Sequence, residues 1–152
     1  MTGPRLQTPL DSTDRHIVTA VQNDGRISLT NLAEAVHLGI SATRIRMQTL
    51  EQRGVITSYT ARVNAARLGL ALRAVVRLRV EGVQDSMVFE ILEREHRIVR
   101  CLRVTGEICF MLEIVATDMA ELERITLQLA ELGTVTTDLI YELILERPIP
   151  AE

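Results

Sequence analysis

The 152-residue sequence has no tryptophan and no lysine, and it holds only two cysteines. No apolar run reaches the roughly 18 residues that a membrane-spanning helix needs. The first residues also lack the apolar core of a secretory signal peptide. We therefore expect a cytoplasmic protein with no membrane partner. Hydrophobic residues make up 47% of the chain, which is enough to build one medium-sized core or two small ones.

The few cysteines and histidines form no pattern typical of a metal site or a catalytic site. Cys101 and Cys109 lie in apolar, strand-like runs without CxxC spacing. They are interpreted as buried free thiols or, alternatively, as a redox pair flanking one hairpin. His16, His37 and His96 are scattered, and no Ser-His-Asp or paired-carboxylate arrangement is evident. We expect no metal, no cofactor and no catalytic residue.

Charge is distributed unevenly along the chain. Its formal net charge is −3, and all 17 basic residues are arginine. Residues 1–68 carry a net charge of about +3 and residues 69–152 about −6, by counting the side chains in the sequence. This pattern favours a first half that meets nucleic acid and a second half that does not.

Residues 28–59 contain two short helical patterns joined by a tight turn. Ser28 is a suitable N-cap, and the apolar residues after it recur at helical spacing: Leu32, Ala33 and Val36. The run His37-Leu38-Gly39 then interrupts the pattern. Two helices joined by such a turn predict a helix-turn-helix, whose second helix enters the DNA major groove.

The second of these helices is predicted from about Ile40 to Gln52, before Gly54, a residue type that ends helices. Thr43, Met47 and Leu50 are predicted to face the core. Five residues of this helix are predicted to point outward: Ser41, Ala42, Arg44, Ile45 and Gln48. Together with Arg46 they form the candidate DNA-binding set.

All of these side chains except Ala42 have a predicted partner. Arg44 can bond guanine and Gln48 can bond adenine, both in bidentate fashion. Ser41 and Arg46 are better phosphate ligands. Arg46 can instead brace the domain through an ion pair, for example with Glu51 or Glu34. Ile45 is predicted either to contact a thymine methyl group or to pack against the first helix or the wing.

The elements around this motif complete a small domain. Asp11 can cap a first helix that runs to about Asn23 and ends at Asp24-Gly25. Its apolar stripe comprises Ile17, Val18 and Val21. The β-branched run 55–63 predicts a strand. Together these elements predict a winged-helix-like module, followed near Gly69 by a domain boundary.

The second half predicts a different architecture. Strands are expected over residues 72–81, 98–104, 108–115 and 135–145. Helices are expected after Asp85 and after Asp118, the latter with its stripe at Leu122, Ile125 and Leu129. The order β-α-β-β-α-β predicts a ferredoxin-like sheet with both helices on one face. The other face would be bare and apolar, which favours dimerisation, either sheet on sheet or edge on edge.

The sequence resembles the Lrp/AsnC, or feast/famine, transcription regulators from Leu10 to about Arg147. The residues that carry the resemblance are Leu10-Asp11, Asp14, Asp24-Gly25-Arg26, Ser28, Leu32-Ala33, Val36, Leu38, Ser41, Arg46, Leu50-Glu51, Gly54-Val55-Ile56, Tyr59, Ala61, Leu68-Gly69 and Thr105-Gly106. The resemblance implies an α+β protein with an N-terminal winged helix-turn-helix domain followed by a C-terminal ferredoxin-like βαββαβ domain. It also implies homodimers, often octamers, that bind an amino acid between dimers.

The expected organisation has five parts: a tail over residues 1–9, the helix-turn-helix domain over 10–54, a connecting strand and linker over 55–69, the ferredoxin-like domain over 70–147 and a tail over 148–152. By analogy with the family, the candidate effector-binding residues are Val104, Thr105, Gly106, Glu107, Thr136 and Thr137. A glycine turn exposes backbone N–H groups that suit a ligand carboxylate. The alternative is an ordinary hairpin turn.

The predicted function is sequence-specific DNA binding by an oligomeric, non-enzymatic regulator. One alternative is a small-molecule-binding protein or enzyme that keeps this architecture but has lost DNA binding, as in the haem-precursor decarboxylases that resemble the family. Gln48 and Thr49 occupy positions that are often basic in the family, and this feature favours the alternative. A stand-alone assembly domain is a third possibility, but such a protein would lack the front half that this chain has.

Overall fold

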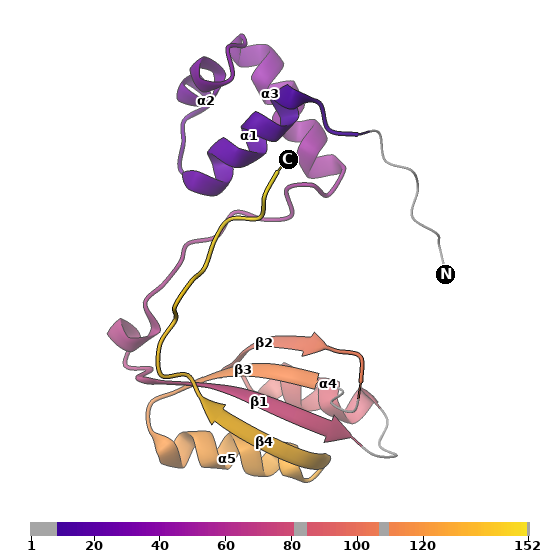
Figure 1. The fold of residues 1–152 in the computed structure, drawn as a ribbon, viewed down its shortest axis with the longest axis vertical. Coiled ribbons are helices and arrows are strands. Elements are labelled where there is room, and N and C mark those ends of the chain that lie inside the picture. Colours follow the sequence, from indigo (N-terminus) through magenta and orange to yellow (C-terminus); the bar gives the residue numbers. More distant parts are fainter. Residues whose placement is uncertain (1–8, 81–84, 107–109, 152) are drawn as a thin grey trace. The chain divides into compact units, whose positions relative to one another are not determined.

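A computed structural model describes residues 9–80, 85–106 and 110–151. The chain divides into two compact units, Met1–Arg62 together with Leu145–Glu152, and Val63–Ile144. Figure 1 shows helices in the first unit and a sheet with two helices in the second. The fold is therefore α+β, with a helical N-terminal part and a C-terminal α/β domain, as the sequence predicts.

The first unit contains α1 (Ser12–Asn23), α2 (Leu29–Ala35) and α3 (Ile40–Gln52). The Asp11 carboxylate accepts the Asp14 N–H at 2.7 Å, and the Ser28 hydroxyl accepts the Asn31 N–H at 3.1 Å. Each bond satisfies a backbone donor that the first turn of a helix leaves unpaired. Both predicted N-caps are thus confirmed.

The three helices meet around a core of four buried aliphatic residues, Ile17, Leu32, Val36 and Leu50. A ring of partly buried apolar residues packs on it: Leu10, Val18, Ala20, Val21, Ile27, Leu38, Met47, Val55 and Ile56. The predicted stripes of all three helices are confirmed. Because each stripe supplies only a few side chains, the unit depends on all three helices to close its core.

Two residues with positive φ bound α3 and set its direction. His37 in the turn before the helix has φ 54°, and Gly54 after it has φ 68°. Glycine adopts this region without the steric cost that a Cβ brings, so Gly54 ends the helix as predicted. Gly39 is the N-cap of α3 and makes no side-chain capping bond.

The strand predicted over residues 55–63 is absent from the described chain. Val55 and Ile56 instead pack on the core of the first unit, and both donate their N–H groups to the Leu50 carbonyl. Residues 57–64 carry no strand assignment. A strand needs a neighbouring strand for its N–H and C=O groups, and the sequence pattern reports β-propensity but not a partner.

Near its start the second unit has a 3₁₀ turn (Ala65–Leu68), and its described residues then form six helices and strands. They are β1 (Leu72–Val80), α4 (Asp85–Arg94), β2 (Ile98–Arg103), β3 (Phe110–Ala116), α5 (Met119–Ala130) and β4 (Gly133–Leu139). The strands are antiparallel and lie in the order β2-β3-β1-β4. This arrangement confirms the ferredoxin-like prediction.

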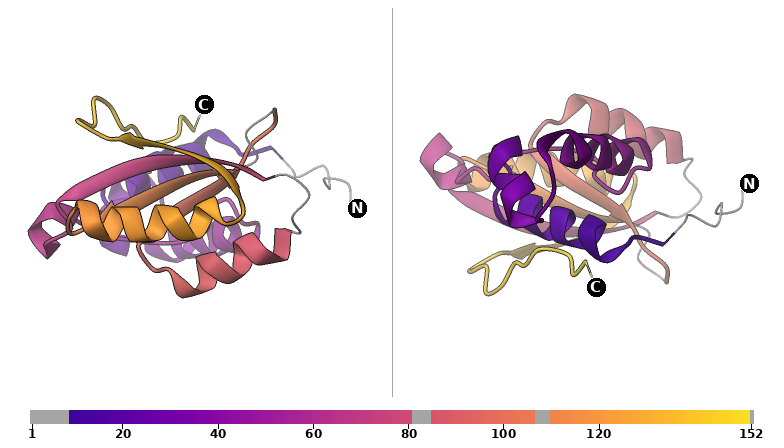
Figure 2. Two further views of the ribbon diagram at one scale, coloured as in Figure 1. Left: turned by 90° about the horizontal axis from the view of Figure 1, so that it is seen from below. Right: turned by 90° about the horizontal axis from the view of Figure 1, so that it is seen from above.

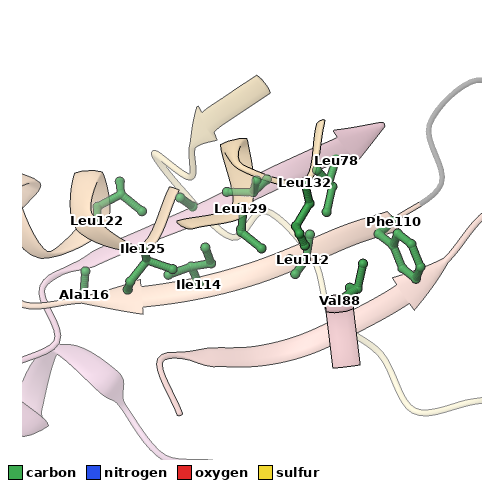
Figure 3. Close-up of a cluster of buried hydrophobic side chains, with 12 residues drawn as sticks. Leu78, Val88, Phe110, Leu112, Ile114, Ala116, Leu122, Ile125, Leu129 and Leu132 are labelled. Atoms are coloured by element: carbon green, nitrogen blue, oxygen red, sulfur yellow. The ribbon is translucent and has the colours of Figure 1, made fainter. Parts of the chain in front are cut away.

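The core of the second unit lies between the sheet and its two helices, which cover the same face (Figure 2). Fully buried Leu112 and Ile114 of β3 meet Ile125 and Leu129 of α5 (Figure 3). The Asp118 carboxylate caps α5 by accepting the Glu121 N–H at 2.9 Å. The predicted cap and the predicted stripe of this helix are both confirmed.

The opposite face of the sheet differs from the bare apolar surface that we expected. Arg73 pairs with Glu113, and Arg77 pairs with Asp138 at 2.8 Å. Because side chains alternate between the faces of a strand, Val75 of β1 shares this face with the arginines. The face therefore combines apolar positions with cross-strand ion pairs.

β4 is shorter than predicted and begins at a position that requires glycine. It ends at Leu139, not at residue 145, and residues 140–151 have no strand assignment. As with residues 55–63, the described chain offers this stretch no paired strand. At the start of β4, a Cβ on Gly133 would lie 2.1 Å from the Arg79 carbonyl oxygen. Only glycine allows this close approach to β1.

Candidate nucleic-acid interface

One surface of α3 carries the predicted DNA-binding side chains. Ser41, Ala42, Arg44, Ile45 and Gln48 are all exposed, and we call these five residues the outer face of α3. The opposite side holds buried Thr43 and Leu50. Thr43 donates its hydroxyl hydrogen to the Gly39 carbonyl at 3.1 Å, so this buried polar group has a partner.

Ile45 is 63% exposed, which is unusual for a large aliphatic side chain on a helix. This exposure contradicts the alternative that Ile45 packs against the first helix or the wing. Arg44 is the exposed arginine of α3. The outer face thus offers one cation, one amide, one hydroxyl and two apolar side chains, a set that can contact both base edges and phosphates.

Arg46 occupies a different environment from Arg44. Its Nη1 lies 2.7 Å from Asp11 Oδ2 and 2.7 Å from Asp14 Oδ1, at the start of α1. The predicted brace is therefore present, but its partners are these two aspartates and not Glu51 or Glu34. Long-range packing of α1 against α3 decides the pairing, and sequence spacing does not report it.

The ion pairs alter the acidity of their partners. Hydrogen bonds, to Asp11 first and then to Asp14, raise the pKa of Arg46. The Asp14 backbone N–H, followed by the Arg46 guanidinium, lowers the pKa of Asp11. Asp14 is itself buried, so Arg46 supplies the countercharge for a carboxylate that water reaches poorly.

A second contact at the other end of α3 was not predicted. The Tyr59 hydroxyl donates to Glu51 Oε1 at 2.8 Å and ties the segment after the helix to its last turns. Burial, and then the hydrogen bond to this carboxylate, raises the pKa of Tyr59 to about 12. An aromatic residue eight positions after a glutamate gives no recognisable local signal.

The candidate effector residues lie at opposite edges of the sheet. Val104, Thr105 and Gly106 follow edge strand β2, and Gly106 has φ 107°. Thr136 and Thr137 lie on edge strand β4, opposite Arg77 and Val76 of β1 in the sheet register. One chain therefore does not bring the two groups together. Glu107 lies outside the described residues.

The remaining candidates stay apart. Cys101 is half-buried opposite Leu112, and burial raises the pKa of its thiol. Cys109 lies outside the described residues, so the redox pair is untested. His16, His37 and His96 are all exposed.

Among the described residues, no group of three or more His, Cys, Asp or Glu side chains could hold a metal ion. Within the same residues, no helix has the length and apolarity to cross a membrane.

Both parts of the chain match known protein families. Residues 10–57 match the family described as "Winged helix-turn-helix DNA-binding". Residues 73–150 match the "Lrp/AsnC ligand binding domain". The first match spans α1, α2 and α3, and the second spans the sheet except for Leu72, the first residue of β1.

Relatives of known sequence and structure agree with these matches. An uncharacterized HTH-type transcriptional regulator of Haemophilus influenzae is 32% identical over 125 residues, covering 80% of this chain and 74% of its own. The solved structure of LrpC from Bacillus subtilis superposes with a TM-score of 0.87 at 25% identity, covering 92% of this chain and all of that one.

Two further solved structures resemble the chain closely. LrpA from Mycobacterium tuberculosis has a TM-score of 0.80 at 27% identity, covering 93% of this chain and 99% of its own. A transcriptional regulator from Neisseria meningitidis, solved as a complex with L-Met, has a TM-score of 0.83 at 25% identity, covering 90% and 93%. From its two matched domains and these relatives, the chain belongs to the Lrp/AsnC family of transcriptional regulators, with a DNA-binding helix-turn-helix and a ligand-binding domain.

Proposed function

We propose that this regulator reads DNA with the outer face of α3 and responds to an amino-acid-like effector as a homo-oligomer. The observation that carries the proposal is the exposure of all five outer-face residues, including the aliphatic Ile45. An exposed apolar group beside a cation and an amide suits the major groove, where thymine methyl groups lie next to hydrogen-bonding base edges.

The outer-face residues divide between bases and backbone. Arg44 bonds guanine, Gln48 bonds adenine and Ile45 contacts a thymine methyl group. Ser41 donates to a phosphate, and Ala42 permits close approach of the helix. Both ion pairs of Arg46 use Nη1, so its phosphate contact is made by the rest of the guanidinium while it braces α1.

Fluorescence anisotropy with DNA from upstream of the protein's own gene tests the proposal. We expect tighter binding to this DNA than to a shuffled duplex of equal length and composition. We also expect the affinity to fall as salt rises, because phosphate contacts release counterions. Equal affinity for both duplexes, or none for either, would contradict sequence-specific recognition.

Self-association supports this function because one α3 carries few charges. Two copies that bind adjacent half-sites gain effective concentration and need less affinity each. We propose a homodimer that can assemble further to an octamer. Its subunits would associate through the sheet face opposite the helices or through the sheet edges. Sedimentation velocity of the full chain tests this, and a monomer at micromolar concentration would contradict it. Its site of action is the cytoplasm, where its DNA target is accessible.

The proposed effector is an amino acid or a related molecule. The Neisseria meningitidis relative was solved with L-Met, and this chain shares its fold over 90% of its length. Candidate contacts are the turn Val104–Gly106 with Glu107, and Thr136 with Thr137 of β4. A thermal-shift screen of the twenty amino acids tests the proposal, and no shift with any of them would contradict it.

A second candidate function follows from the low charge of α3. Because Arg46 is paired with two aspartates, Arg44 is the exposed cation of α3. A protein that binds a small molecule through the second unit, without binding DNA, would tolerate such a surface. It would show an amino-acid thermal shift but no salt-dependent DNA binding, so the two assays separate the candidates.

A further inference from the structure

The C-terminal segment, residues 145–151, groups with the helix-turn-helix unit although it follows the sheet domain in sequence. Gln22 near the end of α1 makes two hydrogen bonds to the backbone of Ile149. Its Nε2 donates to the Ile149 carbonyl at 2.9 Å, and its Oε1 accepts the Ile149 N–H at 2.9 Å. The side-chain amide therefore pairs with the peptide group as a neighbouring strand would.

A second anchor lies two turns earlier on the same face of α1. Arg15 Nη1 donates to the Ala151 carbonyl at 3.1 Å. Arg15 and Gln22 are seven positions apart, or about 10 Å along a helix. Ser12, His16 and Thr19 line the cleft between these anchors and the segment. Figure 1 shows the chain end beside α1.

The segment is suited to this mode of recognition. Prolines at 148 and 150 fix an extended backbone and carry no N–H group, so Ile149 supplies the one donor of the triplet. That donor is the one that Gln22 accepts. The Ile149 side chain is 79% exposed, so α1 recognises the backbone and not the apolar side chain.

We propose that this face of α1 is a docking surface for the chain's own C-terminal segment. When it is docked, two chain segments connect the DNA-binding unit to the second unit instead of one. Residues 140–144 act as a short tether and raise the local concentration of the segment to about the millimolar range, which is enough to populate a contact made of a few exposed hydrogen bonds. The proposal is independent of the proposed function, because it requires neither DNA nor an effector.

Amide hydrogen exchange of the full chain, followed by NMR, tests the docking. We expect the Ile149 N–H to exchange slowly in the wild type and about tenfold or more faster in Gln22→Ala, because the Gln22 Oε1 that accepts this N–H is lost, together with the Nε2 that holds the Ile149 carbonyl. Asn23→Ala is the matched control. Asn23 is an exposed amide on the same helix that does not line the cleft among the described residues.

The outcomes separate docking from its absence. Protection lost in Gln22→Ala but kept in Asn23→Ala supports the proposal. Exchange of Ile149 at the rate of an unstructured peptide in the wild type would overturn it. Equal protection in Gln22→Ala would also overturn it, because the bond to Gln22 would then play no part. Alanine favours helix, so Gln22→Ala should keep α1 folded.

Crosslinking decides whether the segment docks on its own chain. Thr19→Cys, at a position that lines the cleft, is combined with Ile149→Cys, so that both anchors, Arg15 and Gln22, are kept. The chain also carries Cys101→Ala and Cys109→Ala, and the product is treated with a short bismaleimide. We expect a crosslinked monomer on a denaturing gel. A covalent dimer would overturn docking within one chain and assign the surface to a second copy.

Discussion

Arg46 and Asp14, thirty-two positions apart, meet at 2.7 Å and join α3, the proposed recognition helix, to the start of α1. The same Nη1 reaches Asp11, the N-cap of α1. One arginine thus links the cap of the first helix to the middle of the third. Arg46 lies on the same helix as the outer face, but its ion pairs hold α1 and α3 together.

We predict that Arg46→Ala destabilises the first unit by about 1–3 kcal/mol, because buried Asp14 loses its countercharge. Urea unfolding, followed by circular dichroism, measures the change. Arg44→Ala is the matched control and should unfold within about 0.5 kcal/mol of the wild type, since an exposed surface substitution rarely does more. Equal stability of the two variants would contradict the bracing role of Arg46.

DNA affinity should depend on Arg44 more than stability does, so Arg44→Ala should lower DNA affinity although it leaves stability almost unchanged. We predict that Arg44→Ala weakens binding to the specific duplex by about 1–3 kcal/mol and binding to shuffled DNA much less. Gln48→Ala should act similarly at an adenine position. Anisotropy titrations on both duplexes measure the difference. An equal loss on the two duplexes would make Arg44 a phosphate ligand.

Ile45→Ala tests the apolar contact separately. We predict weaker binding to the specific duplex and no loss of fold stability, because the side chain is mostly exposed in the free protein. Replacing a contacted thymine by uracil in the duplex removes the methyl group and should reproduce the loss. Unchanged affinity and sequence preference in Ile45→Ala would refute this contact.

The second unit should lose stability in acid through Glu121. The Thr117 N–H bonds Glu121 Oε2 at 2.7 Å, and Arg97 Nε bonds Oε1 at 2.8 Å. These bonds, the backbone N–H of Thr117 first and Arg97 next, lower the pKa of Glu121 from 4.5 to about 2. Because the folded state holds the charged form, this contribution is present above pH 4.5 and is lost as the pH falls towards about 2.

We predict that Glu121→Gln flattens the fall in unfolding free energy over this pH range. Unfolding by urea at steps of pH between 5 and about 2 measures the slope. Glu123→Gln is the control, since Glu123 is exposed on the same helix. If Glu121→Gln and the wild type fall in parallel, the lowered pKa of Glu121 is not responsible.

Gly133→Ala should destabilise the sheet by about 2 kcal/mol or more, because its Cβ would lie 2.1 Å from the Arg79 carbonyl oxygen. Relief requires β1 and β4 to separate where Val80 faces Gly133. Gly25→Ala is the control, since its Cβ would meet only the Val21 carbonyl oxygen, at 4.0 Å. Thermal unfolding of both variants measures the contrast.

Local chemistry predicted the helices and most of their caps, but Asp85, which was expected to precede its helix as a cap, is the first residue of α4. Asp11, Ser28 and Asp118 each accept the N–H of the residue three positions on, and this signal needs no knowledge of the rest of the fold. The periodic stripes likewise identified Leu50 and Ile125 as core residues. The α+β architecture followed from the order of these elements.

Contacts between distant residues were not predictable in the same way. Residues 55–63 and 140–145 have strand-like composition, but the described chain contains no strand that pairs with them. The partners of Arg46 depend on how α1 crosses α3, and those of Gln22 lie 127 positions away. The exposure of the outer face of α3 was predictable, because helical periodicity alone separates it from Thr43 and Leu50.

The separation of Thr105 and Thr136 at opposite edges of the sheet has a genetic consequence. A site built from both must take one residue from each of two neighbouring copies. Two defective alleles, one altered at Thr105 and the other at Thr136, would then complement each other in mixed assemblies. Some shared sites would combine the intact edge of each chain, while others would carry both defects.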